Sequence, residues 1–442
     1  MTSALLTDLY ELTMAAGYFS AGKTGERATF ELFVRRLPQN RSFLIAAGLP
    51  QAVEYLLNLR FTKDEIDYLR GLPQFHNAPR EFFTYLADIR FTGDLFALPE
   101  GTPFFAGEPV LTVRAPIVEA QLVETYLLSM AGFQTLIASK AARIAEVAGP
   151  RSAVEFGTRR AHSPEAGVLA ARAAYIGGCS GTSNALAGMR FGIPVFGTAA
   201  HSWVLSFETE REAFERLQQL LGPHSVYLLD TYDTVEGARL AAALGEPIFG
   251  VRLDSGNLVA LSRAVREILD RAGLPHARIM ATGDLNEYKI LELCAAGAPI
   301  DAFGVGTDLA TSSDSPSLGA VYKLVELDTA EGTRFKAKLS EEKNTMPGAK
   351  QVFRFSNRDL IGCHWECPSP HARALLQPVL LNGELAAPLP SATEARAYAA
   401  AQVKALPLAL RSLFPAEAEG MWLTEYSPAL LALRDQVVGA LR

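Results

Sequence analysis

The pattern of apolar and polar positions changes twice along the chain. In the first third, residues 7–19 have the spacing of an amphipathic helix, and residues 28–34 alternate as a strand does. Residues 50–87 have helical periodicity, and residues 91–114 have the turn-separated runs of an antiparallel meander. A long helix is predicted from about residue 118 to residue 147.

From residue 152 onward, short apolar runs recur, each followed by a polar cluster and a helical stretch. These intervals have the length of strand–helix units. The runs are residues 153–156, 175–178, 195–197, 226–230, 248–253, 279–282 and 302–305. They predict an α/β fold with an irregular (β/α) barrel of about seven parallel strands. The site of such a fold lies at the carboxyl-terminal edge of the strands.

After residue 318 the pattern is β-rich again, and the tail from residue 391 is mainly helical. We therefore expect three parts. Residues 1–117 and 320–390 form one discontinuous α+β domain, residues 118–319 form the barrel-like catalytic domain, and residues 391–442 form a helical C-terminal segment.

Composition narrows the class of protein. The chain has 442 residues, 49% of them hydrophobic, and a formal net charge of -7. No basic block or basic helix stands out, so we expect no nucleic-acid partner and no membrane. The start of the chain lacks the features of a signal peptide, and the four cysteines are scattered, which indicates a reducing, cytoplasmic location. Cys363 and Cys367 form only half of a zinc site, because no second pair follows.

The polar clusters at the predicted strand ends carry the candidate chemistry. His201 can act as a nucleophile. The glycines of Gly304-Val-Gly306-Thr307 would let backbone N–H groups approach a phosphate, and Thr307 adds a hydroxyl. Arg252 suits a carboxylate, and Asp254 suits ribose hydroxyls or a metal-bridged diphosphate, although the two could simply form a structural ion pair.

A second pair of acids, Asp230 and Asp233, flanks a predicted strand end, where it could orient an imidazole or bind Mg²⁺ through water. No P-loop, dinucleotide-binding, zinc-protease or serine-hydrolase motif stands where its mechanism requires it. The residues alone therefore indicate an enzyme that acts on a phosphorylated, anionic small molecule.

The chain also resembles a known family, nicotinate phosphoribosyltransferase, over nearly its full length. Several long motifs carry the resemblance in the right order. They are Thr7-Asp-Leu-Tyr10-Glu-Leu-Thr-Met14, Phe30-Glu-Leu-Phe-Val-Arg-Arg36, Glu155-Phe-Gly-Thr-Arg-Arg160, Gly197-Thr-Ala-Ala-His-Ser202, Gly250-Val-Arg-Leu-Asp-Ser-Gly256, Gly304-Val-Gly-Thr307 and the segment from Lys338 to Arg354.

This resemblance implies a type II phosphoribosyltransferase-like fold and a reaction. Nicotinate and 5-phosphoribosyl 1-diphosphate would give nicotinate mononucleotide and diphosphate with Mg²⁺, in the salvage of nicotinate for NAD. ATP hydrolysis would be coupled through a phosphorylated histidine, which matches His201. The resemblance places Thr198 and Arg252 on nicotinate and Thr307 on the phosphoribosyl phosphate.

Further residues follow from the same resemblance. The ribose-phosphate site would be lined by Arg159, Arg160, Asp254, Gly283, Asp284, Gly304 and Gly306. Family members are commonly homodimers in which the N-terminal helix completes the neighbour's site, so Tyr10 would stack on the pyridine ring. Some members carry a four-cysteine zinc site that this chain does not match.

Two alternatives remain open from the sequence. A nicotinamide-specific phosphoribosyltransferase could use similar residues. A sugar-phosphate aldolase or isomerase barrel would need a Schiff-base lysine or a glutamate base on a strand. The chain has no lysine between Lys140 and Lys289, which disfavours the Schiff-base version.

Overall fold

A computed structural model describes residues 3–340 and 344–440. The chain divides into two compact units. Unit 1 comprises Met1–Leu136, Ser317–Pro390 and Ala401–Arg442, and unit 2 comprises Ile137–Pro316 and Ser391–Ala400. Two helices run from one unit into the other, α6 (Glu124–Ala148) and α15 (Ala392–Ala405).

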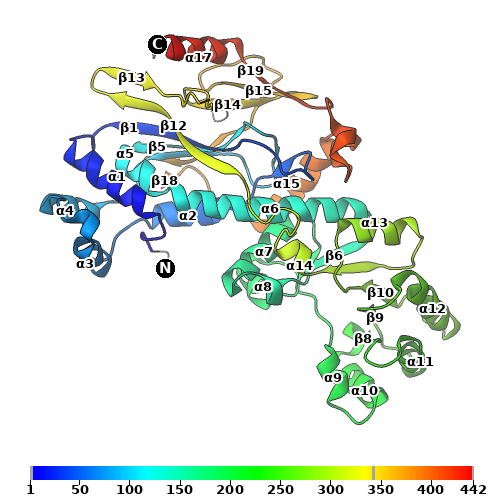
Figure 1. Ribbon diagram of the computed structural model, residues 1–442. Coiled ribbons are helices and arrows are strands. Elements are labelled where there is room, and N and C mark those ends of the chain that lie inside the picture. Colours follow the sequence, from blue (N-terminus) through cyan, green and yellow to red (C-terminus); the bar gives the residue numbers. More distant parts are fainter. Residues whose placement is uncertain (1–2, 341–343, 441–442) are drawn as a thin grey trace. The chain divides into compact units, whose positions relative to one another are not determined.

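Unit 1 contains an antiparallel sheet whose described strands follow the order β13-β12-β1-β5-β3-β17-β18 (Figure 1). The strand bounds are β1 Arg27–Val34, β3 Asp94–Ala97, β5 Pro109–Pro116, β12 Ala320–Thr329, β13 Gly332–Phe335, β17 Gln377–Leu381 and β18 Glu384–Leu385. The central strand β1 pairs with β12 from the second chain segment and with β5 from the first. The sheet therefore joins segments that are about 300 residues apart.

Smaller sheets and helices complete unit 1. A second sheet has the order β16-β14-β15-β19 among the described residues, and β2 pairs with β4. These strands are β2 Leu44–Ile45, β4 Pro103–Phe104, β14 Lys350–Arg354, β15 Arg358–Cys363, β16 Arg373–Ala374 and β19 Leu423–Tyr426. The helices are α1 Leu9–Ser20, α2 Leu49–Leu57, α3 Lys63–Gly71, α4 Arg80–Asp88, α5 Ile117–Leu122, α16 Leu408–Arg411 and α17 Pro428–Ala440, with short 3₁₀ turns at Pro73–Phe75 and Pro415–Ala418.

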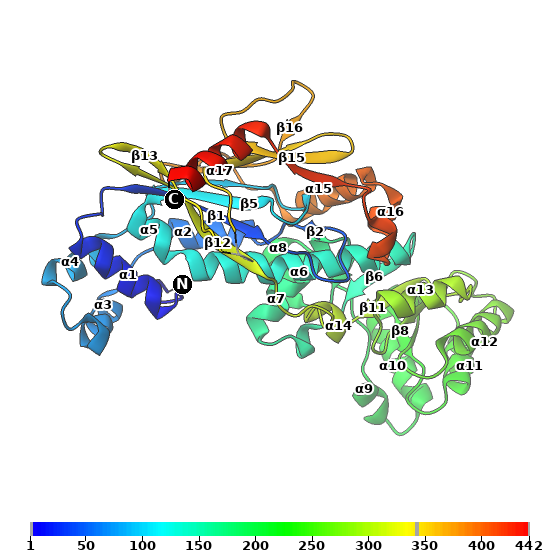
Figure 2. The same ribbon diagram turned by 45° about the horizontal axis from the view of Figure 1, so that its top comes forward.

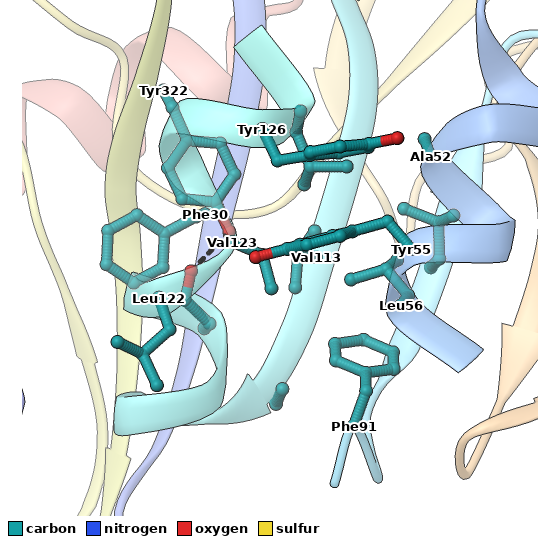
Figure 3. Packing of buried hydrophobic residues seen from close by; sticks show 14 of the residues in the cluster. Phe30, Ala52, Tyr55, Leu56, Phe91, Val113, Leu122, Val123, Tyr126 and Tyr322 are labelled. Atoms are coloured by element: carbon teal, nitrogen blue, oxygen red, sulfur yellow. Dashed lines mark hydrogen bonds between the residues drawn. The ribbon is translucent and has the colours of Figure 1, made fainter. Parts of the chain in front are cut away.

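The core of unit 1 contains stacked aromatic rings (Figure 3). Tyr55 of α2 stacks on Tyr126 of α6 with ring centroids 3.9 Å apart. Phe30 of β1 stacks on Tyr322 of β12 at 4.8 Å. The Tyr322 hydroxyl donates a hydrogen bond of 2.8 Å to the carbonyl of Ala120. This hydrogen bond satisfies a buried hydroxyl and links β12 to α5.

Unit 2 is built on a parallel sheet, part of which is labelled in Figure 2 (β6, β8 and β11). In the described part of the chain its strand order is β7-β6-β11-β10-β9-β8. Its strands are β6 Ser152–Glu155, β7 Gly181–Thr182, β8 Val226–Leu228, β9 Gly250–Leu253, β10 Arg278–Ala281 and β11 Ala302–Val305. Its helices are α7 Pro164–Ile176, α8 Ala185–Phe191, α9 His201–Leu205, α10 Glu210–Leu221, α11 Thr234–Leu244, α12 Leu258–Arg271, α13 Glu287–Ala295 and α14 Thr307–Ala310, with 3₁₀ turns at Thr158–Arg160 and Gly222–His224.

The parallel α/β architecture is confirmed, but a closed barrel is not. The strand order is cyclic, as a barrel requires, because β11 pairs with β6. No pairing among the described residues joins β8 to β7, so the sheet has two edges. A single bridge from Thr182 to Val195 extends the β7 edge.

Two predicted strands were wrong. Residues 175–178 end the helix α7 instead, because Val168, Ala171 and Tyr175 form a buried helical face against α8. An apolar run of this length does not distinguish a buried helix from a strand. Residues 195–197 form only the bridge at Val195, and the predicted helix from 118 to 147 is divided at Val123 into α5 and α6.

No helix among residues 3–340 and 344–440 is long and apolar enough to cross a lipid bilayer.

Unit 2 contains a buried ionic cluster. Lys140 of α6 lies 2.8 Å from Glu287 of α13 and 2.9 Å from Asp314, and Arg143 lies 3.0 Å from Glu287. The side chains of Lys140 and Glu287 are 2% and 0% exposed. Buried charges are tolerated only when they are paired, so this cluster fixes α13 against α6.

We expect Glu287→Ala to destabilise unit 2 by about 3–5 kcal/mol, because Lys140 and Arg143 would lose a buried counter-charge. Urea unfolding followed by circular dichroism measures the change. Glu292→Ala on the same helix is the control, since Glu292 is exposed and its loss should cost about 0.5 kcal/mol or less. Equal effects of the two substitutions would contradict this role of the cluster.

The helix α1 gives a pH-dependent prediction. Glu11 is buried, and this burial raises the pKa of its carboxyl to about 7, with the charge of Glu124 adding to the effect. A carboxyl with a raised pKa contributes full stability below its ordinary value of 4.5 and loses it as the pH rises toward 7. Glu11→Gln removes this loss. As the pH rises from 4.5 to 8, the free energy of unfolding of the variant should therefore increase by about 2 kcal/mol relative to that of wild type.

Thermal unfolding at a series of pH values checks this expectation. Glu81→Gln on α4 is the matched control, because Glu81 is exposed to solvent. A difference between Glu11→Gln and wild type that stays constant across this pH range would show that Glu11 is not the responsible group.

Candidate functional site

The carboxyl ends of the parallel strands bring together most of the residues predicted from the sequence. Thr182 ends β7, Glu155 ends β6, and Val305 ends β11. Thr282 follows β10, and Asp254 follows β9. Because these strands are parallel neighbours, the residues that follow them lie along one edge of unit 2.

Arg252 on β9 makes a dense set of contacts at this edge. Its Nε donates to Thr282 Oγ1 at 2.8 Å, its Nη1 donates to Thr198 Oγ1 at 2.9 Å, and its Nη2 donates to Asp254 Oδ1 at 2.7 Å. A guanidinium has five N–H groups. Three are used by these bonds, so two remain, and no described residue accepts from them. Arg252 thus offers two N–H donors, one on Nη1 and one on Nη2.

The acceptors around Arg252 are already occupied. Thr198 Oγ1 accepts from Arg252 and donates to the carbonyl of Ala199 at 3.1 Å. Asp254 Oδ1 accepts from both Arg252 and Thr282. Burial disfavours the charged form of Asp254, but the hydrogen bonds from Thr282 and Arg252 and the nearby charges outweigh it, so the pKa of Asp254 lies below its ordinary value. The pair seen here includes the structural ion pair that the sequence left open as an alternative.

His201 is the first residue of α9, not a residue beyond a strand end as expected. Its Nδ1 lies 3.2 Å from the hydroxyl of Thr231, which follows β8. Its Nε2 lies 3.8 Å from Asp254 Oδ2, which is too far for a hydrogen bond. The Thr231 contact orients the ring and leaves Nε2 on the side of Asp254. The side chain is 42% exposed, so a ligand can reach it.

Backbone packing fixes the turn after β10. Gly283 has φ +90°, and a Cβ atom there would lie 2.0 Å from the carbonyl oxygen of Asp254. Only glycine fits this approach. The next residue, Asp284, also has a positive φ of 47°, and its carbonyl accepts from Lys289 Nζ at 2.7 Å. Asp284 is exposed at this turn.

The glycines of β11 allow close packing beside the same turn. A Cβ atom on Gly304 would lie 2.6 Å from Thr282 Cγ2 and 2.7 Å from the Phe156 ring. Gly306 precedes α14, whose first residue is Thr307. Thr307 is exposed, so its hydroxyl is available to a ligand.

Arg159 and Arg160 lie in the short 3₁₀ turn after β6, and both are exposed. The buried Glu155 holds the start of this loop. It accepts from the backbone N–H of Gly157 and, at 2.6 Å, from the hydroxyl of Thr182. Burial raises the pKa of Glu155. The loop that carries the two arginines is therefore tied to the ends of both β6 and β7.

The two acids after β8 have different environments. Asp233 caps α11, because its Oδ1 accepts from the N–H groups of Val235 and Glu236, both at 2.9 Å. It orients no imidazole. Asp230 accepts from Ser255 Oγ at 2.5 Å through Oδ2, while Oδ1 is buried without a partner among the described residues. Nor is any group of three or more histidine, cysteine, aspartate or glutamate side chains arranged to hold a metal in the described part.

Two predicted parts of the site belong to unit 1. Tyr10 lies on α1, and its residue surface is 46% exposed. In the segment from Lys338 to Arg354, Lys343 lies outside the described residues. Lys350 is buried and forms an ion pair of 2.6 Å with Glu31, so its charge is neutralised inside unit 1. The proposed role of Tyr10 stays a prediction.

Sequence reasoning missed Thr282 and did not single out Thr231. Thr282 was assigned to a predicted strand, yet its hydroxyl contacts both Arg252 and Asp254. Thr231 was read only as part of a polar cluster, yet it contacts the His201 ring. The signal for both was their position, since each is a hydroxyl residue at the carboxyl end of a parallel strand.

Comparison with known proteins gives the family. Residues 5–131 match the family model described as nicotinate phosphoribosyltransferase (NAPRTase) N-terminal domain, and residues 152–334 match the model of the NAPRTase family. A relative from Mycobacterium tuberculosis, nicotinate phosphoribosyltransferase pncB2, is 45% identical over 99% of this chain and 93% of its own length. A Bacillus subtilis nicotinate phosphoribosyltransferase is 46% identical over 80% of this chain and 74% of its own length.

Solved structures agree with the sequence comparisons. The crystal structure of human nicotinic acid phosphoribosyltransferase superposes with a TM-score of 0.84 over 98% of this chain and 99% of that chain, at 28% identity. A nicotinate-nucleotide pyrophosphorylase from Pyrococcus furiosus superposes with a TM-score of 0.74 over 91% of this chain and 95% of that chain, at 26% identity. From its sequence matches and its fold, the chain belongs to the nicotinate phosphoribosyltransferase family.

Proposed function

We propose that this chain forms nicotinate mononucleotide and diphosphate from nicotinate and 5-phosphoribosyl 1-diphosphate, in the salvage of nicotinate for NAD. Membership of the family supports the reaction. The observation that supports nicotinate as the substrate is that Arg252 has two N–H groups without a hydrogen-bond acceptor among the described residues. A planar pyridine carboxylate matches this guanidinium fork.

The same edge favours nicotinate over nicotinamide. The neighbouring acceptors Thr198 Oγ1, Thr282 Oγ1 and Asp254 Oδ1 already take hydrogen bonds from Arg252. A carboxamide bound at the same two donors would place its NH2 group against one of the Arg252 N–H groups. Leaving a polar group unpaired in a binding site reduces affinity strongly. The amide-specific alternative is therefore disfavoured by the hydrogen-bond pattern.

The phosphoribosyl diphosphate would lie along the rest of the strand edge. Thr307 offers an exposed hydroxyl, and Gly306 before it lets the backbone approach the sugar phosphate, whereas Gly304 is buried against Thr282 and Phe156. The exposed Arg159 and Arg160 supply positive charge for the diphosphate. Asp254, Gly283 and Asp284 lie at the adjoining turns, where a carboxylate can accept ribose hydroxyls.

Catalysis would then rest on positioning and charge. Displacement at the anomeric carbon passes through a state with oxocarbenium character while diphosphate leaves. Holding the pyridine nitrogen in line with that carbon lowers the barrier, and cationic groups stabilise the departing anion. The arginines named above are suited to that second role.

Mg²⁺ fits this site as an ion carried by the diphosphate. Mg²⁺ binds through one or two carboxylates together with phosphate oxygens and water, and does not need an all-protein cage. Asp230 fits this use, because its Oδ1 is buried without a partner among the described residues. Asp254 and Asp284 are two further carboxylates at this edge. When bound, Mg²⁺ would neutralise charge on the leaving diphosphate.

ATP would act as a co-substrate through His201. The Thr231 hydroxyl lies 3.2 Å from Nδ1, so it can accept a hydrogen bond from an N–H at Nδ1, and in that tautomer Nε2 carries the lone pair. That lone pair can attack the terminal phosphate of ATP, with ADP as the leaving group. The phosphoryl group would add about two negative charges beside the site. This change would reorganise the surrounding loops and favour substrate binding.

A Schiff-base aldolase is not supported. Lys140 is buried and paired with Glu287 and Asp314, and Lys289 lies on the helix α13, where it donates to the carbonyl of Asp284. Neither is placed as a Schiff-base lysine on a strand, and the intervening chain has no lysine.

The assembly and location remain proposals. We propose a homodimer with shared active sites, in which Tyr10 of one copy stacks on the pyridine ring in the other. The half-exposed Tyr10 ring supports this role. We also propose a cytoplasmic location, because all four cysteines lie in the described part of the chain and none is paired.

Arg252→Lys should lower kcat/KM for nicotinate by about 100-fold, because a single ammonium replaces a planar fork that makes two charge-assisted hydrogen bonds. Steady-state kinetics with nicotinate and nicotinamide measure this loss. Arg239→Lys on α11 is the control, since Arg239 is exposed and pairs only with Glu236 among the described residues. Unchanged nicotinate turnover in Arg252→Lys would remove the basis of the proposed substrate.

Incubation with γ-labelled ATP tests the role of His201. We expect an acid-labile phosphate on His201, and in His201→Ala we expect neither the label nor any increase of turnover by ATP. His276→Ala is the control, because His276 is an exposed histidine of the same unit. Label on another residue, or ATP-stimulated turnover that survives in His201→Ala, would refute the phosphohistidine.

A further inference from the structure

Thr282 lies between the two charged groups of the site. Its Oγ1 accepts from Arg252 Nε at 2.8 Å and donates to Asp254 Oδ1. We infer that Thr282 is a positioning residue that sets the direction in which Arg252 offers its two free N–H groups to the pyridine carboxylate. This inference rests on the proposed function.

Strand geometry gives Thr282 this position. In the parallel pairing of β9 with β10, Arg252 lies opposite Met280 and Leu253 lies opposite Ala281. Side chains alternate between faces along a strand, so Arg252 and Asp254 share one face with Thr282. The Thr282 hydroxyl can therefore contact both partners at once, whereas residue 281 points to the other side of the sheet.

Packing restricts the side chain to this orientation. Thr282 is 3% exposed, and its methyl group lies against Gly304, where a Cβ atom would come within 2.6 Å of it. β-Branched side chains have few χ1 rotamers, and a confined methyl reduces them further. With the methyl held against β11, Oγ1 is directed toward β9.

The hydrogen bonds of Thr282 help to fix the orientation of the Arg252 guanidinium. Nε and Nη2 of Arg252 donate to Thr282 and Asp254, which are themselves hydrogen-bonded to each other. Two acceptors joined in this way fix the plane of the guanidinium. Without the Thr282 hydroxyl, Nε would be left without an acceptor in a largely buried place, and the guanidinium would turn to find one.

Thr282→Val and Thr282→Ala both remove the hydroxyl, but valine keeps the size of threonine and alanine is smaller. One variant therefore remains informative if the other folds poorly. We expect both to raise the KM for nicotinate by about tenfold to a hundredfold, as for the loss of a hydrogen bond to a charged group. The KM for 5-phosphoribosyl 1-diphosphate should rise less than the KM for nicotinate, because Asp254, which is proposed to bind the ribose, keeps its hydrogen bond from Arg252 when the Thr282 hydroxyl is lost. Thr282→Ser keeps the hydroxyl and should restore a nicotinate KM near that of wild type.

Thr29→Val is the matched control. Thr29 of β1 is also a buried threonine that donates to a buried carboxylate, here Glu326 at 3.1 Å. Its substitution should lower the thermal midpoint without a selective effect on nicotinate. A purely structural role for Thr282 would instead change both KM values together.

Three results would overturn the inference while leaving the proposed function intact. They are an unchanged nicotinate KM in Thr282→Val and Thr282→Ala, equal rises in both KM values, or a Thr282→Ser variant as impaired as Thr282→Val. Absence of any nicotinate turnover in the wild-type protein would refute the proposed function itself. Wild-type turnover is therefore measured before any variant is compared.

Discussion

The parallel pairing of β9 with β10 is the constraint on which the site depends. Its register puts Arg252, Asp254 and Thr282 on one face at the carboxyl end of two neighbouring strands. Arg252, Asp254 and Thr282 are hydrogen-bonded to one another, so the cluster can be partly buried without a large desolvation cost. A slip of one residue would send these side chains to the opposite face.

The same arrangement explains how an acidic protein can hold an anionic substrate. The chain carries a formal net charge of -7, so its overall field does not attract a carboxylate or a phosphate. Local geometry supplies the attraction instead. Asp254 neutralises part of the charge of Arg252, and one N–H on each terminal nitrogen has no acceptor among the described residues. A directional donor pair recognises a carboxylate by its shape, which a diffuse positive field would not do.

Much of the parallel sheet could be predicted from the sequence, because buried apolar runs such as those at β8, β9, β10 and β11 alternate with amphipathic helices. The run at residues 175–178 was mistaken for a strand because Tyr175 and Ile176 pack equally well in a buried helix. The candidate residues His201, Arg252 and Asp254 followed from motifs. Thr282 did not, because its role depends on the register between two strands, and one sequence does not contain that information.

Asp254 lies beside both Arg252, which is proposed to bind nicotinate, and His201, which is proposed to be phosphorylated. One of its oxygens accepts from Arg252, and the other lies 3.8 Å from Nε2 of His201. If His201 carries a phosphoryl group as proposed, new negative charge arises beside a carboxylate that is already ionised. Two like charges at that separation repel strongly in a partly buried site. Asp254 can relieve the repulsion only by moving or by drawing its cationic partner closer, and that partner is the arginine proposed to bind nicotinate. Phosphorylation of His201 would thus affect nicotinate binding through Asp254 alone, because this carboxylate neighbours both His201 and Arg252.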